Sequence, residues 1–164
     1  MSELRIGQGI DIHPFADGRA CVLGGVTIPH ARGLLGHSDA DALVHALIDA
    51  ILGATGQRDI GTLFPDTDQA YKGANSCELL RRVWAITSAE RWRVVNADIT
   101  VLAEAPKIKP YVPMMISKLS EILCCSPDRL AIKATTTERL GFVGREDGVV
   151  ASAVVLLERA EPKS

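Results

Sequence analysis

Three side chains of types that commonly bind metals occur in the first third of the sequence. Asp11 and His13 are two residues apart in an expected strand over 4–13, so both project from one face of that strand. His45 falls on an expected helix over 39–53, at the edge of its apolar stripe, where a half-buried structural histidine is an equal alternative. One carboxylate and two imidazoles leave a fourth position open on a tetrahedral ion, which is typical of catalytic Zn²⁺.

The residues around these side chains favour the metal interpretation. Gly7 and Gly9 share the face of the metal-binding pair and leave room for another group to approach the backbone. Asp41 and Asp49 lie about one helical turn before and after His45. Either carboxylate could therefore hold the imidazole by accepting a hydrogen bond from the ring nitrogen that does not bind the metal.

Two polar segments have the residue types of a phosphate site. Residues 36–41, with the sequence GHSDAD, span the start of the expected helix, where Ser38 suits the N-cap. His37 could donate to a phosphoryl oxygen bound at the helix N-terminus, and a purely structural cap is an equal alternative. Residues 134–138, with the sequence ATTTE, place three hydroxyls and a carboxylate at the end of an expected strand. That composition suits a phosphate with its metal ion, although a hydroxyl-rich turn without a ligand is an equal alternative.

Two further loops are less specific. The acidic loop over 59–68 could hold sugar hydroxyls through its carboxylates, but a solvated turn is the more frequent structure of such a sequence. The loop over 103–109 joins an expected strand to an expected helix. Its backbone groups could bind a base edge and Lys107 could meet a phosphate, yet on its own the segment indicates only a connection.

Composition excludes several classes of partner. The chain has 164 residues and a formal net charge of −2, so there is no basic excess to neutralise a nucleic-acid backbone. No apolar run is long enough to span a bilayer. The first residues lack the pattern of a targeting peptide, and the four cysteines form no CxxC pair. We therefore expect a cytoplasmic protein with reduced thiols, and no membrane or nucleic-acid partner.

Strand and helix patterns alternate along one domain over 1–160, followed by a C-terminal tail over 161–164. The alternation predicts an α/β domain with α+β character and a mixed sheet of about four strands, with helices on one face and the other face packed in a subunit interface. In the first strand, Ile6, Ile10 and Ile12 share the face opposite the glycines. The expected elements are strands over 4–13, 93–104, 129–136 and 149–159, a hairpin over 21–27, helices over 39–53, 75–90 and 110–124, and a long loop over 56–74.

Taken in order, these segments closely resemble the 2-C-methyl-D-erythritol 2,4-cyclodiphosphate synthase family over residues 4–158. The resemblance rests on residues 5–13, 35–43, 59–68 and 133–145. It implies a phosphorus–oxygen lyase of the non-mevalonate isoprenoid pathway, in which the 2-phosphate of 4-diphosphocytidyl-2-C-methyl-D-erythritol 2-phosphate attacks the β-phosphate and CMP leaves. It also implies a homotrimer with active sites at the subunit interfaces.

The resemblance assigns roles to individual residues. It implies Asp11, His13 and His45 as Zn²⁺ ligands and Glu138 as a ligand of a second ion, Mg²⁺ or Mn²⁺. It implies His37 and Thr136 as the catalytic residues that stabilise the transition state. The substrate-binding residues that it implies are Asp11, His13, His37, Ser38, Asp59, Ile60, Gly61, Phe64, Pro65, Asp66, Thr67, Asp68, Ala103, Glu104, Ala105, Pro106, Lys107, Ile108, Lys109, Thr135, Thr136, Thr137, Glu138, Phe142 and Arg145.

Two other functions are compatible with the same residues. The first is a metal-dependent phosphodiesterase, which would use the same ligands with water as the nucleophile and would not need a 2-phosphate. The second is a non-catalytic trimer that binds a nucleotide or an isoprenoid. In such a protein, replacement of His37 with Ala would leave ligand binding intact.

Overall fold

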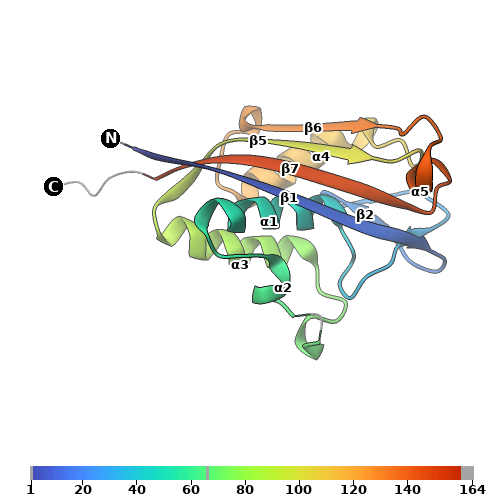
Figure 1. Ribbon diagram of the computed structural model, residues 1–164, viewed down its shortest axis with the longest axis horizontal. Helices are drawn as coiled ribbons and strands as arrows, with labels where there is room; N and C mark the ends of the chain where they lie inside the picture. Colours follow the sequence, from blue (N-terminus) through green and yellow to red (C-terminus); the bar gives the residue numbers. More distant parts are fainter. Residues whose placement is uncertain (1, 66, 160–164) are drawn as a thin grey trace.

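The computed structural model describes residues 2–65 and 67–159 (Figure 1). Asp66 and the expected tail over 161–164 lie outside the described residues. Within them the chain forms one sheet of five strands with helices packed on one face, and a separate two-stranded hairpin. This agrees with the expected α/β architecture.

The sheet contains four long strands and one very short one. Its order is β4 (Gly33–Leu34), β1 (Glu3–Ala16), β7 (Gly148–Arg159), β5 (Trp92–Leu102) and β6 (Leu130–Thr135). Only β5 and β6 run parallel, and the other pairs are antiparallel, so the sheet is mixed as expected. The two residues of β4 are too few to show an alternating pattern, which is why the sequence indicated about four strands.

The expected hairpin and the three long helices are present. The hairpin pairs β2 (Cys21–Leu23) with β3 (Val26–Ile28) around a Gly24–Gly25 turn in which both glycines have positive φ. The helices are α1 (Ala42–Thr55), α3 (Ser76–Ala89) and α4 (Val112–Ile122), the last preceded by a 3₁₀ turn at Lys109–Tyr111. No helix among the described residues is long and apolar enough to cross a membrane.

The segment over 56–74 is not the continuous loop that we expected. It contains α2 (Ile60–Leu63) and a 3₁₀ turn at Gln69–Tyr71. Both turns begin at an aspartate whose side chain accepts a backbone N–H, Asp59 from Thr62 and Asp68 from Ala70. Such short helices carry no measurable apolar period. The same limit explains why α5 (Gly141–Gly144) and the 3₁₀ turn at Pro127–Arg129 were missed.

Helix α1 begins three residues later than the sequence indicated. Its N-cap is Asp41, whose carboxylate accepts the Val44 N–H at 3.1 Å, and Ser38 is not the cap. The Ser38 hydroxyl instead accepts the Ala40 N–H, and Ala40 has a positive φ, so the chain bends before the helix starts. Asp41 also accepts from Gly24 N and Gly25 N, and thereby joins the hairpin to α1.

The two faces of the sheet differ sharply in burial. On the helix side, Val149, Ala151, Ala153, Val155 and Leu157 of β7 are buried against the helices. On the other side, Ile6, Ile10 and Ile12 of β1 are 71%, 54% and 54% exposed. Large aliphatic side chains in a continuous exposed row are typical of a surface that meets another molecule.

The glycines of β1 allow α1 to lie directly against the strand. A Cβ at Gly7 would stand 1.9 Å from Ala50 O, and one at Gly9 would stand 2.0 Å from Ala46 O. Any side chain at either position would therefore force the helix backbone away from the strand. The group that approaches the glycine face of β1 is thus α1 itself.

Replacing Gly7 with Ala tests this contact. We expect Gly7→Ala to lower the free energy of unfolding by about 1–3 kcal/mol, because the new methyl overpacks the interface between α1 and β1. Gly53→Ala is the matched control, since its Cβ would be 3.8 Å from its nearest neighbour, Gln8 O, inside the same helix. There, alanine should stabilise the helix by about 0.5–1 kcal/mol. Urea unfolding of both variants measures the difference, and equal effects would contradict the close-contact argument.

Candidate active site

Packing of α1 on β1 brings the three predicted metal ligands together. Asp11 Oδ2 lies 2.9 Å from His13 Nε2 and 3.2 Å from His45 Nδ1, and the two ring nitrogens are 3.3 Å apart. All three ligand atoms lie within 4.8 Å of one another. Among the described residues this is the group of three or more His, Cys, Asp and Glu side chains that can hold a metal ion.

Hydrogen bonds on the far side of each ring fix which nitrogen faces the cluster with a lone pair. His13 Nδ1 lies 2.8 Å from Leu35 O, and a carbonyl can only accept, so Nδ1 carries the proton. His45 Nε2 lies 3.2 Å from Ser38 Oγ and 2.8 Å from Ser76 Oγ, and Ser76 itself donates to the Asp39 carboxylate. Ser76 therefore accepts from His45 Nε2, and Nδ1 of His45 is left as an acceptor.

This arrangement fits a bound cation. With both imidazoles neutral, two ring lone pairs and a carboxylate oxygen converge on one point. Asp11 Oδ2 is buried and accepts no well-formed hydrogen bond from any described residue. An Asp-His-His set with its outer nitrogens held in this way is a typical divalent-metal site.

Asp11 and His13 shift each other's pKa. Burial alone would raise the pKa of Asp11, but the neighbouring imidazoles of His13 and His45 outweigh burial and hold the pKa well below its usual range. Burial alone would lower the pKa of His13, yet the Asp11 carboxylate outweighs it and raises that pKa. The carboxylate is thus ionised at neutral pH, as a metal ligand must be.

A cavity of about 420 Å³ opens directly onto the three ligands. Its wall combines the metal cluster with the segment before α1 and with α2. The lining residues are Asp11, His13, Gly36, His37, Ser38, His45, Ile60, Gly61, Phe64, Tyr71 and Leu79. The lining therefore combines polar groups with apolar side chains, which suits a small polar ligand.

Sequence comparison now places the chain among known proteins. A model of the YgbB family matches residues 4–158. The chain belongs to this family. It is 53% identical over 156 residues to a 2-C-methyl-D-erythritol 2,4-cyclodiphosphate synthase of Listeria innocua, covering 95% of this chain and 99% of that protein. A protein of the same name from Geobacillus kaustophilus is also 53% identical, with the same coverage.

Solved structures agree with the sequence comparison. The bifunctional IspDF from Campylobacter jejuni superposes with a TM-score of 0.94 at 42% identity, and the match covers 98% of this chain but 44% of that longer one. A CDP complex of IspF from Plasmodium falciparum superposes with a TM-score of 0.85 at 35% identity, covering 96% of this chain and 97% of the other.

A second cavity of this YgbB-family chain gathers residues from the other predicted loops. It has a volume of about 210 Å³ and lies between the loop after β5 and the end of β6. Its lining residues are Ala103, Pro106, Lys107, Ile108, Lys109, Ala134, Thr135 and Thr136. Ile12 in β1 and Thr135 in β6 lie in one row across the sheet. Three strand spacings separate them, which corresponds to about 14 Å. The two cavities share no lining residue.

The remaining predicted residues lie around these two cavities. Asp59 and Asp68 cap short helices, and the Asp68 carbonyl accepts from His37 Nε2 at 3.2 Å. Pro65 and Thr67 flank Asp66, which is outside the described residues.

Glu104 and Ala105 lie in the loop after β5. Thr137 and Glu138 follow β6, and Phe142 lies in α5. Arg145 pairs with Asp147 at 2.9 Å, so in this structure its guanidinium is held at its own turn.

The expected support for His45 was wrong in its details. Asp41 is occupied by the cap of α1 and by the hairpin, and burial raises its pKa to about 6. Asp49 accepts the Ile60 N–H at 2.7 Å and thereby fixes the start of α2. Ser76, which donates to Asp39, and Ser38 hold the imidazole instead. Ser76 carried no sequence signal, because it is simply the first residue of α3 and meets His45 only through the tertiary packing.

Tyr71 and Leu79 are two further cavity residues that sequence reasoning missed. Leu79 falls on the buried side of α3, where an apolar residue indicates only packing. Tyr71 stacks edge-on against Phe64 with ring centroids 5.2 Å apart. Gly36 has a separate role, because a Cβ there would stand 2.8 Å from His13 Cε1 and would displace the ring.

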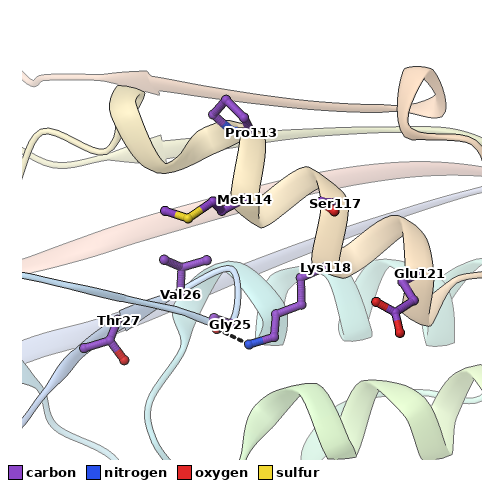
Figure 2. Close-up of a pocket in the computed structure, with 8 residues that line it drawn as sticks. All are labelled: Gly25, Val26, Thr27, Pro113, Met114, Ser117, Lys118 and Glu121. Carbon is purple, nitrogen blue, oxygen red and sulfur yellow. Dashed lines mark hydrogen bonds between the residues drawn. The ribbon is translucent and has the colours of Figure 1, made fainter.

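A groove of greater volume than the cavity at the metal cluster lies elsewhere. Figure 2 shows it between the hairpin and α4, with a volume of about 690 Å³. Lys118 Nζ donates to Gly25 O across it at 2.6 Å, so its one cation is already engaged. Its lining residues include no His, Asp or Cys. It therefore lacks the chemistry that the cluster on β1 and α1 provides.

The serine behind His45 yields a test of the metal site. We expect Ser76→Ala to weaken binding of Zn²⁺ about 10-fold, the lower end of the usual range for such partners, because the imidazole loses its shorter hydrogen bond and keeps only the contact with Ser38 at 3.2 Å. The control is Ser88→Ala on the same helix, whose hydroxyl contacts only the Ala85 carbonyl, at 3.4 Å. Competition with a chromophoric chelator measures the affinity, and circular dichroism checks the fold. Unchanged zinc affinity in Ser76→Ala would refute the role of Ser76 in holding His45.

Proposed function

We propose that this chain converts 4-diphosphocytidyl-2-C-methyl-D-erythritol 2-phosphate into 2-C-methyl-D-erythritol 2,4-cyclodiphosphate with release of CMP, as a phosphorus–oxygen lyase of isoprenoid biosynthesis. The observation that carries the proposal is the cluster of Asp11, His13 and His45 at the end of a cavity, in a chain 53% identical to synthases of that name. The reaction is a phosphoryl transfer, which depends on positioning and charge neutralisation more than on covalent catalysis.

Metal ions complete the site in this proposal. The donor set of the cluster suits Zn²⁺, and the single carboxylate of Glu138 suits a Mg²⁺ or Mn²⁺ that takes its other ligands from phosphates and water. When bound, these cations polarise the β-phosphate as Lewis acids and neutralise charge between the α- and β-phosphates.

The protein residues position the two reacting phosphates. His37 and Ser38 line the same cavity as the metal cluster. The Ser38 hydroxyl can donate to a phosphoryl oxygen, and so can His37 Nε2 once it leaves the Asp68 carbonyl. Ile60, Gly61 and Phe64 form the opposite wall, and there the methylerythritol unit is held. Holding the 2-phosphate against the β-phosphorus raises its effective concentration, and no general base is needed because the attacking phosphate is already an anion.

We assign the nucleotide half of the substrate to the second cavity. Two solved relatives of this chain are CDP complexes, at 35% and 38% identity. The loop over 103–109 offers backbone groups for a base edge and Lys107 for a phosphate. Thr135 and Thr136 at the end of β6 add hydroxyls near the same space, and Thr136 is the second residue that we assign to transition-state stabilisation.

A homotrimer would bring the two halves together. Within one copy the two cavities share no lining residue, and β1 is about 14 Å from β6. In the proposed trimer the metal cluster of one copy would face the nucleotide cavity of its neighbour. The exposed aliphatic row on β1 supplies an apolar surface for such an assembly. A cytoplasmic location stays a prediction from the cysteine pattern.

Product analysis tests the reaction. The purified chain with Zn²⁺ and Mg²⁺ should release CMP and the cyclic diphosphate from the full substrate, and should release no CMP from the analogue that lacks the 2-phosphate. Asp11→Asn should lower CMP release by more than about 100-fold, since losing a ligand exceeds the 10–100-fold effect typical of outer partners. The control is Asp17→Asn, an exposed aspartate in the turn after β1.

Mass spectrometry of the products distinguishes the alternatives. CMP release from the analogue without the 2-phosphate would indicate a phosphodiesterase and contradict the cyclisation. Nucleotide binding without turnover of either compound would indicate a binding protein. Full activity of Asp11→Asn in the absence of metal would contradict the metal-dependent mechanism.

Light scattering after size exclusion tests the assembly. We expect the wild-type chain to elute at three times the mass of one copy, and Ile10→Glu to shift the population to single copies, because a charge in the apolar face resists burial. Ile86→Glu on α3 is the control, since Ile86 is also exposed, at 44%, but lies away from this face. A wild-type monomer, or equal behaviour of the two variants, would overturn the trimer proposal.

A further inference from the structure

The turn that follows β6 has an unusual backbone. Glu138 and Arg139 both have positive φ, 53° and 62°, although neither is glycine. Leu140 N donates to Thr137 O at 2.9 Å and closes a four-residue turn around them. Two positive φ values at the centre of a turn are typical of the type I′ conformation, for which Asn-Gly is the favoured pair. Side chains in this region are unfavourable and persist only where the surroundings hold them.

One carboxylate from a neighbouring loop holds this turn. Glu104 Oε1 accepts Thr137 N at 3.1 Å and Arg139 N at 3.0 Å, and the Thr137 hydroxyl lies 3.4 Å away. Both backbone donors come from residues of the turn itself. The Arg139 N–H, followed by the donors of Thr137, lowers the pKa of Glu104. The acceptor is therefore a charged carboxylate, which makes the stronger type of hydrogen bond.

The opposite side of the turn is also fixed. A Cβ at Gly144 would stand 2.0 Å from the carbonyl carbon of Arg139, so the end of α5 packs directly on the turn backbone. Glu104 and Gly144 thus confine Arg139 between them. Sequence alone did not separate these contacts from ordinary loop contacts, because Glu104 and Arg139 are 35 residues apart.

The shape of the turn determines where two functional groups lie. Thr136 Oγ1 donates to Glu138 Oε1 at 3.1 Å, and Glu138 N donates back to Thr136 Oγ1 at 3.3 Å. The hydroxyl assigned to the transition state and the carboxylate assigned to the second cation are therefore oriented together. Relaxation of the turn to negative φ would re-aim both.

We propose that Glu104 is a positioning residue for the diphosphate part of the substrate and does not contact the nucleoside. Its carboxylate holds the strained turn that presents Thr136 and Glu138, and it joins the loop after β5 to the loop after β6. This role rests on the proposed function, in which those two side chains meet phosphates and a divalent cation. It differs from the family resemblance, which places Glu104 among the residues of the cytosine pocket.

Binding measurements on the full, assembled protein test the role. Glu104→Ala should weaken binding of CDP with Mg²⁺ about 10-fold, the effect of roughly one charged hydrogen bond, and should leave cytidine binding within about twofold. Glu104→Gln keeps an acceptor oxygen at the same place and should restore CDP binding to within about threefold of wild type. Glu121→Ala on the outer face of α4 is the matched charge-removal control.

Kinetics and amide exchange complete the test. Glu104→Ala should lower kcat more than it raises KM, and the amides of Thr137 and Arg139 should exchange with solvent faster. Equal losses of cytidine and CDP binding would show a direct nucleoside contact, and an unchanged kcat with unchanged CDP binding would show no role; both overturn the proposal. Failure of the wild-type protein to release CMP would instead contradict the proposed function, while the CDP and cytidine comparison still tests Glu104.

Discussion

The close contact between the backbone of α1 and the glycine face of β1 is the constraint on which the candidate site depends. Carbonyl oxygens of Ala46 and Ala50 occupy the space that side chains at Gly9 and Gly7 would fill. His45 precedes Ala46 on the helix, and Asp11 and His13 follow Gly9 on the strand. The distance between helix and strand therefore sets the distance between the ligands. A core contact of this kind is rigid, because close-packed interiors yield little, so it positions the ligands more accurately than a loop would.

Polar partners behind the ligands complete what the packing begins. The Leu35 carbonyl holds one imidazole, and the chain from Asp39 through Ser76 holds the other. Each partner fixes a tautomer, so the lone pairs converge where a cation neutralises them. The segment before α1 has two roles in this arrangement. It places His37 and Ser38 at the cavity, and it supplies Asp39 and Asp41 to α3 and the hairpin. Structural and chemical demands on this short polar sequence are thus inseparable.

The two halves of the proposed reaction lie at different strands of one sheet. The metal cluster depends on β1 and α1, whereas the turn after β6, to which we assign the phosphates, depends on β5, β6 and the carboxylate of Glu104. A sheet holds its strands at fixed spacing, so the two halves of one copy cannot close on each other. The proposed trimer would bring the two halves together, and the exposed isoleucines of β1 offer an apolar surface for it. Stability of the assembly and completeness of the active site would then depend on the same interface.

Sequence by itself determined the features that depend on local pattern and residue type. The alternation of Ile6, Ile10 and Ile12 with the glycines, Asp11 and His13 predicted the two faces of β1, and the Gly24–Gly25 pair predicted the hairpin. The residue types of the Asp-His-His set predicted a metal site, which the structure brings together. Only the tertiary structure decided that α1 is the group on the glycine face, that Asp41 rather than Ser38 caps this helix, and that Ser76 rather than Asp41 or Asp49 holds His45. The physical reason is that these contacts depend on how separate segments pack together. Such contacts produce no repeating pattern of residue types that the sequence alone would show.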